Sequence, residues 1–183
     1  MTTRENDHSS IQRSIWNELE KAISNRHHGW RTPVLATIDQ NGLPDARTVV
    51  LREVDTKNHK LTIYTDKRSP KVSQIVQQSD VALVFWCAQL NWQLRIQASA
   101  KLCDNQDRIN QVWQQVRSTA GASDYLSIQA PSSPLYHQGA LAEDQHALCI
   151  VELHIQVIDW LSLSHQDHKR ACLENNQLTW LTP

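Results

Sequence analysis

The fold is decided mainly by the stretch ARTVVLREV at residues 46–54 and by LTIYTDKRSPK at residues 61–71. β-Branched and apolar residues concentrate in 46–54 and 61–65, and such runs predict two strands joined by a turn. Ser69 and Pro70 follow, and a serine before a proline is typical of the first residues of a helix. The segment therefore predicts two antiparallel strands and then a short helix that ends near residue 79.

Basic side chains occupy defined positions in the same segment. Arg47 and Arg52 lie five positions apart, an odd spacing, so they point to opposite faces of the predicted strand. Lys71 falls in the first turn of the predicted helix, where free N–H groups and the positive end of the helix dipole favour an anion. An arginine fork together with this lysine would hold a phosphate group. Each cation alone is typical of a solvated surface charge, so the hypothesis depends on the joint pattern.

Further strands and helices are predicted on both sides of this segment. The strands at 34–38, 46–54 and 61–65 are expected to form an antiparallel meander. Other strands are predicted at 81–87, 91–102, 147–163, 169–174 and 178–181, and helices at about 10–25, after a cap at Asp104, and at 121–128. This pattern predicts a mainly β fold with flanking helices, in the form of a small closed or split β-barrel. We expect residues 1–183 to form one domain, with residues 1–8 disordered.

Composition and charge limit the function classes. The chain has 183 residues, a net charge of −1 and 40% hydrophobic residues, which fits a globular domain without a basic surface for nucleic acid. The four cysteines form no C-x-x-C pair and the histidines show no ligand spacing, so neither a metal site nor a disulfide framework is indicated. An apolar run is missing from the first residues, and no stretch reaches about 20 apolar residues. A cytoplasmic protein without membrane contact is therefore expected.

Four short stretches resemble motifs of one known family. They are ARTVVLR at 46–52, YTDKRSPK at 64–71, QI at 74–75 and LNWQLRI at 90–96. In this order and spacing they are similar to the FMN-binding core of the pyridoxamine 5'-phosphate oxidase family, and the likeness returns near the C-terminus. The resemblance implies an FMN-binding split β-barrel and a homodimer that holds the flavin between its subunits.

The resemblance also implies roles for individual side chains. The expected cofactor-binding residues are Arg47, Thr48, Val49, Tyr64, Thr65, Lys71, Gln93, Gln129, Trp160 and Arg170. The expected substrate-binding residues are Arg52, Arg117 and His168. The resemblance assigns neither a catalytic residue nor a metal ligand.

The chain departs from the classical oxidase at two of its substrate positions. Gln166 stands where the oxidase motif R-L-H-D-R begins with arginine, and Trp113 stands where the oxidase has a tyrosine. The change to glutamine removes a cation and a planar donor fork. The chain is therefore more similar to the oxidase-related subfamily whose substrates are often unassigned.

These features favour an FMN-dependent oxidoreductase acting on CH–NH2 or CH–OH groups of a small molecule, with a B6 phosphate as the candidate substrate. The flavin would carry the redox chemistry and the protein would supply orientation and electrostatics. A non-enzymatic flavin- or haem-binding protein remains the alternative. A plain interaction domain would leave the pattern of Arg47, Lys71 and Gln93 unexplained.

Overall fold

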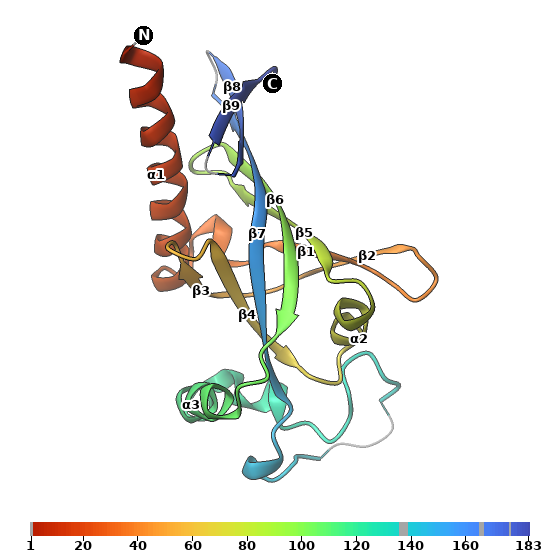
Figure 1. Ribbon diagram of the computed structural model, residues 1–183. Coiled ribbons are helices and arrows are strands. Elements are labelled where there is room, and N and C mark those ends of the chain that lie inside the picture. The colour runs from red at the N-terminus through yellow and green to blue at the C-terminus, as the bar shows by residue number, and fades with distance from the viewer. Residues whose placement is uncertain (1, 136–138, 165–166, 176) are drawn as a thin grey trace.

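The computed structural model describes residues 2–135, 139–164, 167–175 and 177–183, and in the first helix it describes side chains from residue 10 onward (Figure 1). The helices are α1 (Thr2–Ser24), α2 (Pro70–Gln77) and α3 (Gln106–Val116), and the short 3-10 turns are η1 (Gly29–Arg31), η2 (Ala120–Tyr125) and η3 (Glu143–Gln145). The strands are β1 (Val34–Ile38), β2 (Pro44–Thr48), β3 (Leu51–Asp55), β4 (Lys60–Asp66), β5 (Asp80–Cys87), β6 (Trp92–Leu102), β7 (Leu148–Leu163), β8 (His168–Glu174) and β9 (Gln177–Leu181). Among these helices, none is both long and apolar enough to cross a membrane.

The strands form one antiparallel sheet that is not closed by hydrogen bonds. Its order is β2-β1-β5-β6-β7-β4-β3, and β8 and β9 extend from the far end of β7. The two edge strands β2 and β3 follow each other in the chain, with only Val49 and Val50 between them. The sheet must therefore curl until its edges approach, because two residues cannot bridge a flat sheet of this width.

This curl corrects the prediction of one long strand at 46–54. The strand is divided at Val49–Val50, since β2 pairs with β1 at one edge and β3 pairs with β4 at the other. The N–H of Val49 leaves the ladder and donates to the carbonyl of Pro33 at 2.9 Å. The predicted meander is therefore wrong as a whole, and two separate hairpins take its place. Local propensity could not reveal the division, because β-branched valines favour a continuous strand.

The core fills the inner side of the curved sheet. Strand β5 alternates strictly between exposed and buried residues, as its sequence predicts, with Leu83 and Phe85 fully buried. Helix α1 packs against β3 and inserts Ile15 and Leu19, which have no exposed surface. A smaller apolar cluster lies under α3 around Trp113. The main core thus lies on one face of the sheet, and the cluster under α3 covers part of the other face where β4 pairs with β7. The rest of that other face, along β1 and β5, is open to further contacts.

Three helical predictions need correction. Helix α1 begins at Thr2, whereas its start was expected near residue 10, and neither glycine nor proline interrupts that extension. The N-cap of α3 is Asn105 and not Asp104, since the Asn105 side chain accepts the N–H of Arg108. The predicted helix at 121–128 is the 3-10 turn η2, which ends at Tyr125.

Candidate functional site

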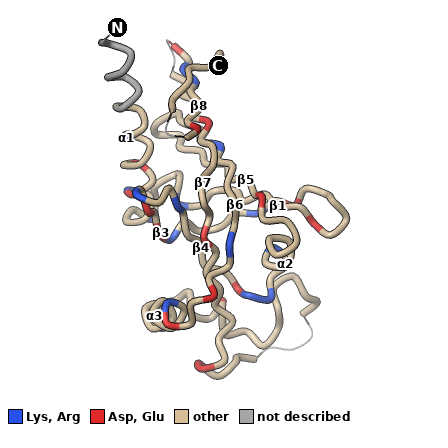
Figure 2. The backbone as a smooth tube through the Cα atoms, in the orientation of Figure 1, with Lys and Arg blue, Asp and Glu red and all other residues tan. Residues whose placement is uncertain are grey.

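The start of α2 and the end of β4 position one lysine. Ser69 is the N-cap residue with extended backbone and Pro70 opens the helix, as predicted from the sequence. The ammonium of Lys71 donates to the hydroxyls of Thr65 and Ser69, both at 3.1 Å. Within the part of the chain that the structure describes, two of its three N–H groups have an acceptor. The third is left for a ligand. Figure 2 shows the basic segment at this connection between β4 and α2.

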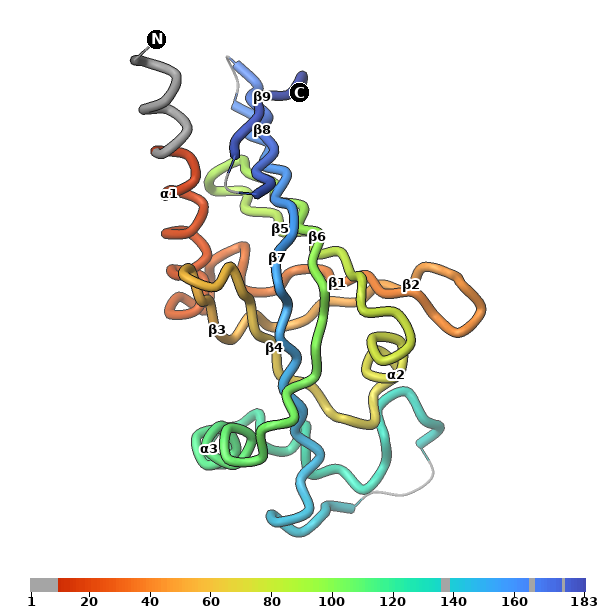
Figure 3. The backbone as a smooth tube through the Cα atoms, in the orientation of Figure 1, coloured from red at the N-terminus to blue at the C-terminus, as the bar shows by residue number. Residues whose placement is uncertain are grey.

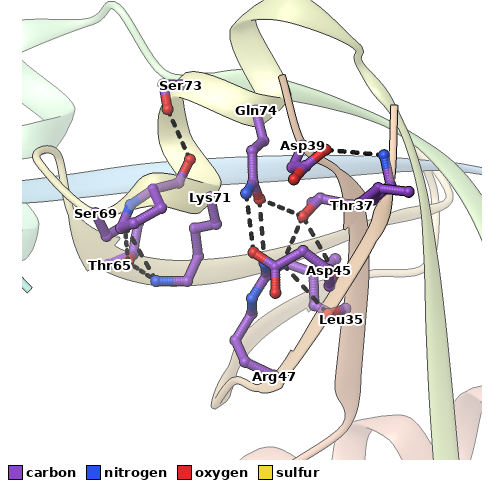
Figure 4. Close-up of polar contacts among 12 residues, drawn as sticks. Leu35, Thr37, Asp39, Asp45, Arg47, Thr65, Ser69, Lys71, Ser73 and Gln74 are labelled. Carbon is purple, nitrogen blue, oxygen red and sulfur yellow. Dashed lines mark hydrogen bonds and ion pairs between the residues drawn. The ribbon is translucent and has the colours of Figure 1, made fainter. Parts of the chain in front are cut away.

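Arg47 lies beside this lysine in a network of polar side chains (Figure 4). Its guanidinium donates to the hydroxyl of Thr37 at 2.6 Å and to the side-chain oxygen of Gln74 at 3.1 Å. It also pairs with the carboxylate of Asp45 at 2.5 Å. Thr37 and Gln74 are more than nine-tenths buried, so they hold the arginine in one place.

The electrostatics of the two cations favour an anion. Burial, and next the charge of Arg47, lower the pKa of Lys71. A lysine whose charged form is disfavoured by a neighbouring cation gains stability when a negative group binds between them. The hydroxyls of Thr65 and Ser69 add possible donors to an anion, and the positive end of the α2 dipole lies at the helix start that carries Lys71. The arrangement can hold a phosphate.

A second group of side chains lies one residue earlier on β4. The hydroxyl of Tyr64 donates to Glu53 at 2.5 Å, and Glu53 accepts from Arg108 at 2.6 Å. The guanidinium of Arg52 lies 5.7 Å from the centre of the Tyr64 ring. Its Nε is buried and meets no hydrogen-bond acceptor in the described chain. Burial raises the pKa of Tyr125, and the nearby Arg52 offsets part of that rise. Arg52 is thus a half-buried cation between two tyrosines.

Arg117 is placed apart from Arg52. It is exposed, pairs with Glu143 at 3.4 Å and lines a hollow with Trp113 and His146, whose rings stack at 4.4 Å. Arg52 does not line this hollow. The two predicted substrate arginines therefore have different surroundings in the structure.

The opposite end of β7 carries another group of predicted residues: Gln93, Trp160, His168 and Arg170. Gln93 on β6 and Arg170 on β8 both pair with Leu161 of β7, whereas Thr65 pairs with Cys149. Twelve residues of extended strand separate these two points, which is roughly 40 Å along β7. Figure 3 shows β8 and β9 at one end of β7 and α3 at the other.

Trp160 and Arg170 are both held by neighbours at this end. Trp160 is 3% exposed and meets Trp92 edge to face at 5.2 Å, while its indole N–H is buried with no partner among the described residues. Arg170 donates to Asp159 at 3.0 and 2.8 Å. His168 is exposed at the first residue of β8. Gln166 lies outside the described residues.

Three predicted cofactor residues have other surroundings. Thr48 is exposed at the end of β2 and Val49 is buried next to it. The side-chain nitrogen of Gln129 donates to the carbonyl of Pro134 at 3.1 Å, while its oxygen is buried and unpaired within the described chain. Arg68 ties the loop before Gln129 to the end of β4 through the carbonyl of Ser127 at 2.8 Å.

Sequence reasoning missed part of the phosphate site. Thr37, Asp45 and Ser69 were not expected to contact the two cations, and Gln74 was noticed only as part of a motif. Gln74 could have been found because it lies one helical turn after Lys71. No local signal pointed to Thr37, which comes from another strand. Among the described residues, no group of three His, Cys, Asp or Glu side chains could hold a metal ion.

A curved antiparallel sheet with a cationic, hydroxyl-lined site at a helix start defines a protein that binds a phosphorylated ligand. The model of the family "Pyridoxamine 5'-phosphate oxidase, FMN-binding domain" matches residues 13–104, half of the chain. The chain belongs to this family, and FMN is its cofactor. The site fits the group, because Arg47, Lys71 and the hydroxyls around them supply the charge and donors that a phosphate requires.

The similarity to one known protein extends beyond the segment that the family model matches. A pyridoxine/pyridoxamine 5'-phosphate oxidase of Azorhizobium caulinodans is 27% identical over 161 residues, which cover 80% of this chain and 75% of the relative. One from Chromohalobacter salexigens is 41% identical over 75 residues, covering 38% and 34%. The chain spans 30 to 42% of the length of the curated relatives that it matches first.

Two solved structures share the fold. A pyridoxamine 5'-phosphate oxidase-related, FMN binding protein from Nostoc punctiforme has a TM-score of 0.78 at 23% identity, and the match covers 93% of this chain and 96% of the other. PhzG from Burkholderia lata has a TM-score of 0.71 at 14% identity, with 90% and 88% covered. At this identity the likeness supports the fold alone.

Proposed function

We propose that the protein is an FMN-dependent oxidoreductase of the pyridoxamine 5'-phosphate oxidase type that works as a homodimer with a split-barrel subunit. The observation that carries the proposal is that two cations lie close together: Lys71, which contacts the hydroxyls of Thr65 and Ser69, and Arg47, whose charge lowers the pKa of that lysine. When bound, FMN supplies the capacity to accept a hydride. The phosphate site would orient it by fixing one end, while Tyr64 and Arg52 line the adjacent part of β3 and β4.

A second copy of the chain is needed to bring both groups of predicted cofactor residues to one flavin. Thr65 and Arg170 are separated along β7 by more than the length of an FMN molecule. The outer face of the sheet is also unusually apolar, since Val34, Ile38, Val84 and Trp86 are each more than one-third exposed. Val34 and Val84 are directly paired across β1 and β5. Such a face is typical of an interface.

The proposed substrate carries a phosphate or another anionic group. Arg52 supplies a half-buried cation with an unused Nε–H among the residues described, flanked by the rings of Tyr64 and Tyr125. An arginine in such surroundings favours a planar, negatively charged partner. His168 would approach from the other subunit, since it belongs to the distant group on β8. A B6 phosphate combines an anionic group and an aromatic ring, so it is the substrate we would test first.

The cofactor is tested by the absorption spectrum of the purified protein and of the protein after FMN is added. We expect a flavin spectrum in the wild type and in Arg13→Ala, which removes an exposed arginine of α1. Arg47→Ala should lose the flavin while it keeps its circular dichroism. A flavin spectrum that bleaches on anaerobic addition of pyridoxine or pyridoxamine phosphate would support the substrate class. A wild-type protein that binds no FMN, or shows a haem band in its place, would refute the proposal.

The dimer is tested by light scattering after size-exclusion chromatography. Val84→Asp places a charge on the apolar face and should yield a monomer that binds FMN poorly. Val76→Asp is the matched control, because Val76 is 70% exposed on α2, away from that face. A Val84→Asp protein that stays dimeric with normal flavin content would contradict the proposed interface.

A further inference from the structure

The terminal N–H groups of Arg47 are already occupied by the protein. Its Nη1 donates to the hydroxyl of Thr37 at 2.6 Å and, more weakly, to the carbonyl of Leu35 at 3.4 Å. Its Nη2 contacts Gln74 Oε1 at 3.1 Å and Asp45 Oδ2 at 2.5 Å. A guanidinium has two N–H groups on each of these nitrogens, so all four have an oxygen partner. A phosphate oxygen that binds Nη2 must therefore replace one of them.

Asp45 is the partner that can leave. Its side chain is 45% exposed, whereas Thr37 and Gln74 are 2% and 7% exposed and belong to the packed interior. Asp45 sits on β2 close to the β1–β2 turn, and in Figure 4 its carboxylate lies between the side chains of Arg47 and Gln74. Releasing an exposed carboxylate to water is easy, because surface ion pairs are weak. Removing a buried hydroxyl or amide would leave unpaired groups in the core.

The same oxygen of Asp45 marks the position of a ligand oxygen. Oδ2 accepts from Arg47 Nη2 and, at 2.8 Å, from the side-chain nitrogen of Gln74. Two converging donors on one anionic oxygen are the arrangement that phosphate oxygens prefer. When the carboxylate leaves, both donors become available together. The side-chain oxygen of Gln74 stays engaged by Thr37 and Arg47, so the amide keeps its orientation.

We infer that Asp45 is an internal anion that occupies the phosphate position of the free protein and is displaced when the flavin phosphate binds. Asp45 thereby lowers the affinity for FMN and acts on the phosphate alone, so it sets how strongly the protein prefers FMN over riboflavin. This inference rests on the proposed phosphate site at Arg47 and Lys71. The role of Asp45 is competitive: it keeps the arginine paired in the absence of ligand, which limits binding of other anions.

The experiment compares dissociation constants of the apo-protein for FMN and riboflavin by quenching of flavin fluorescence. Asp45→Asn keeps the size and the acceptor for Gln74 but removes the charge, and it should bind FMN about two- to fivefold more tightly, in line with the loss of one partly exposed ion pair. Riboflavin affinity should not change. Asp45→Ser is a second variant, in case the asparagine protein folds poorly.

Asp39→Asn is the matched control for charge alone. Asp39 is a neighbouring carboxylate whose field reaches Asp45, but it contacts the β1–β2 turn and not Arg47. An equal gain in FMN affinity for Asp39→Asn would show a long-range charge effect and overturn displacement. If the wild type binds FMN and both Asp45 variants bind it equally or more weakly, the inference is overturned. If neither the wild type nor the Asp45 variants bind FMN, the phosphate site itself is refuted.

Discussion

Replacing Lys71 by methionine tests the phosphate site with least disturbance of the fold. The substitution removes one cation and two hydrogen bonds, to Thr65 and Ser69. The two hydroxyls lie 3.3 Å apart and can bond each other, so neither is left unpaired. The buried ammonium is itself disfavoured, as its lowered pKa indicates. We therefore expect the free energy of unfolding of the apo-protein to change by less than about 1 kcal/mol.

Lys71→Met is expected to weaken the binding of FMN. One charge-assisted hydrogen bond to phosphate contributes about 1.5–3 kcal/mol, so Lys71→Met should raise the dissociation constant for FMN about 10- to 150-fold. Riboflavin, which has no phosphate, should bind both proteins equally. Lys67→Met is the control, since Lys67 is an exposed lysine in the same connection. Titration of apo-protein with each flavin measures these values. Equal FMN affinity in wild type and Lys71→Met would refute the phosphate site.

The same lysine predicts a pH dependence. Its pKa in the folded protein lies below the ordinary 10.5, so between these two pKa values the unfolded chain binds more protons and apo-protein stability rises with pH. A bound phosphate favours the charged lysine and raises its pKa. FMN affinity of the wild type should therefore fall as pH rises through the pKa of the free protein, while the phosphate remains a dianion. The affinity of Lys71→Met should show no such fall, and a parallel decline in both proteins would contradict the assignment.

Other parts of the structure give further expectations. Gly29→Ala should lower the free energy of unfolding in urea by about 1–3 kcal/mol, because the added Cβ would lie 2.7 Å from a main-chain oxygen of β5. In the control Gly121→Ala the added Cβ meets no atom closer than 3.8 Å, so the free energy of unfolding should stay within about 1 kcal/mol of the wild type. Equal effects of the two substitutions would contradict this packing. Glu53→Gln should lower the raised pKa of Tyr64, because burial would then act without the neighbouring negative charge. The phenol should titrate at lower pH in ultraviolet absorbance, measured against a Tyr64→Phe reference. An unchanged titration would show that burial alone sets this pKa. His168→Ala should keep its flavin and lose turnover of pyridoxine phosphate, and intact turnover would exclude the substrate role.

The candidate site was predictable where it depends on adjacent residues. Ser69 and Pro70 favour a helix start through their local chemistry, and the helix that follows them places Lys71 at its N-terminus. Arg47 was placed correctly on a strand, but its partners were not predicted. Asp45 is two residues away in sequence, and its contact depends on both side chains leaning toward α2.

The sequence by itself determined the type and extent of most strands, because burial on one side of a sheet imposes a period of two that is visible locally, as in Val81–Cys87. The sequence also determined the family, because the short motifs occur in the same order along the chain as in that family. Only the tertiary structure decided that the chain breaks at Val49–Val50, that the edge strands are consecutive, and that the group with Arg170 lies far from Lys71. These features depend on which strands pair across the sheet. Pairing between distant segments is a property of the whole packed chain, and no local pattern records it.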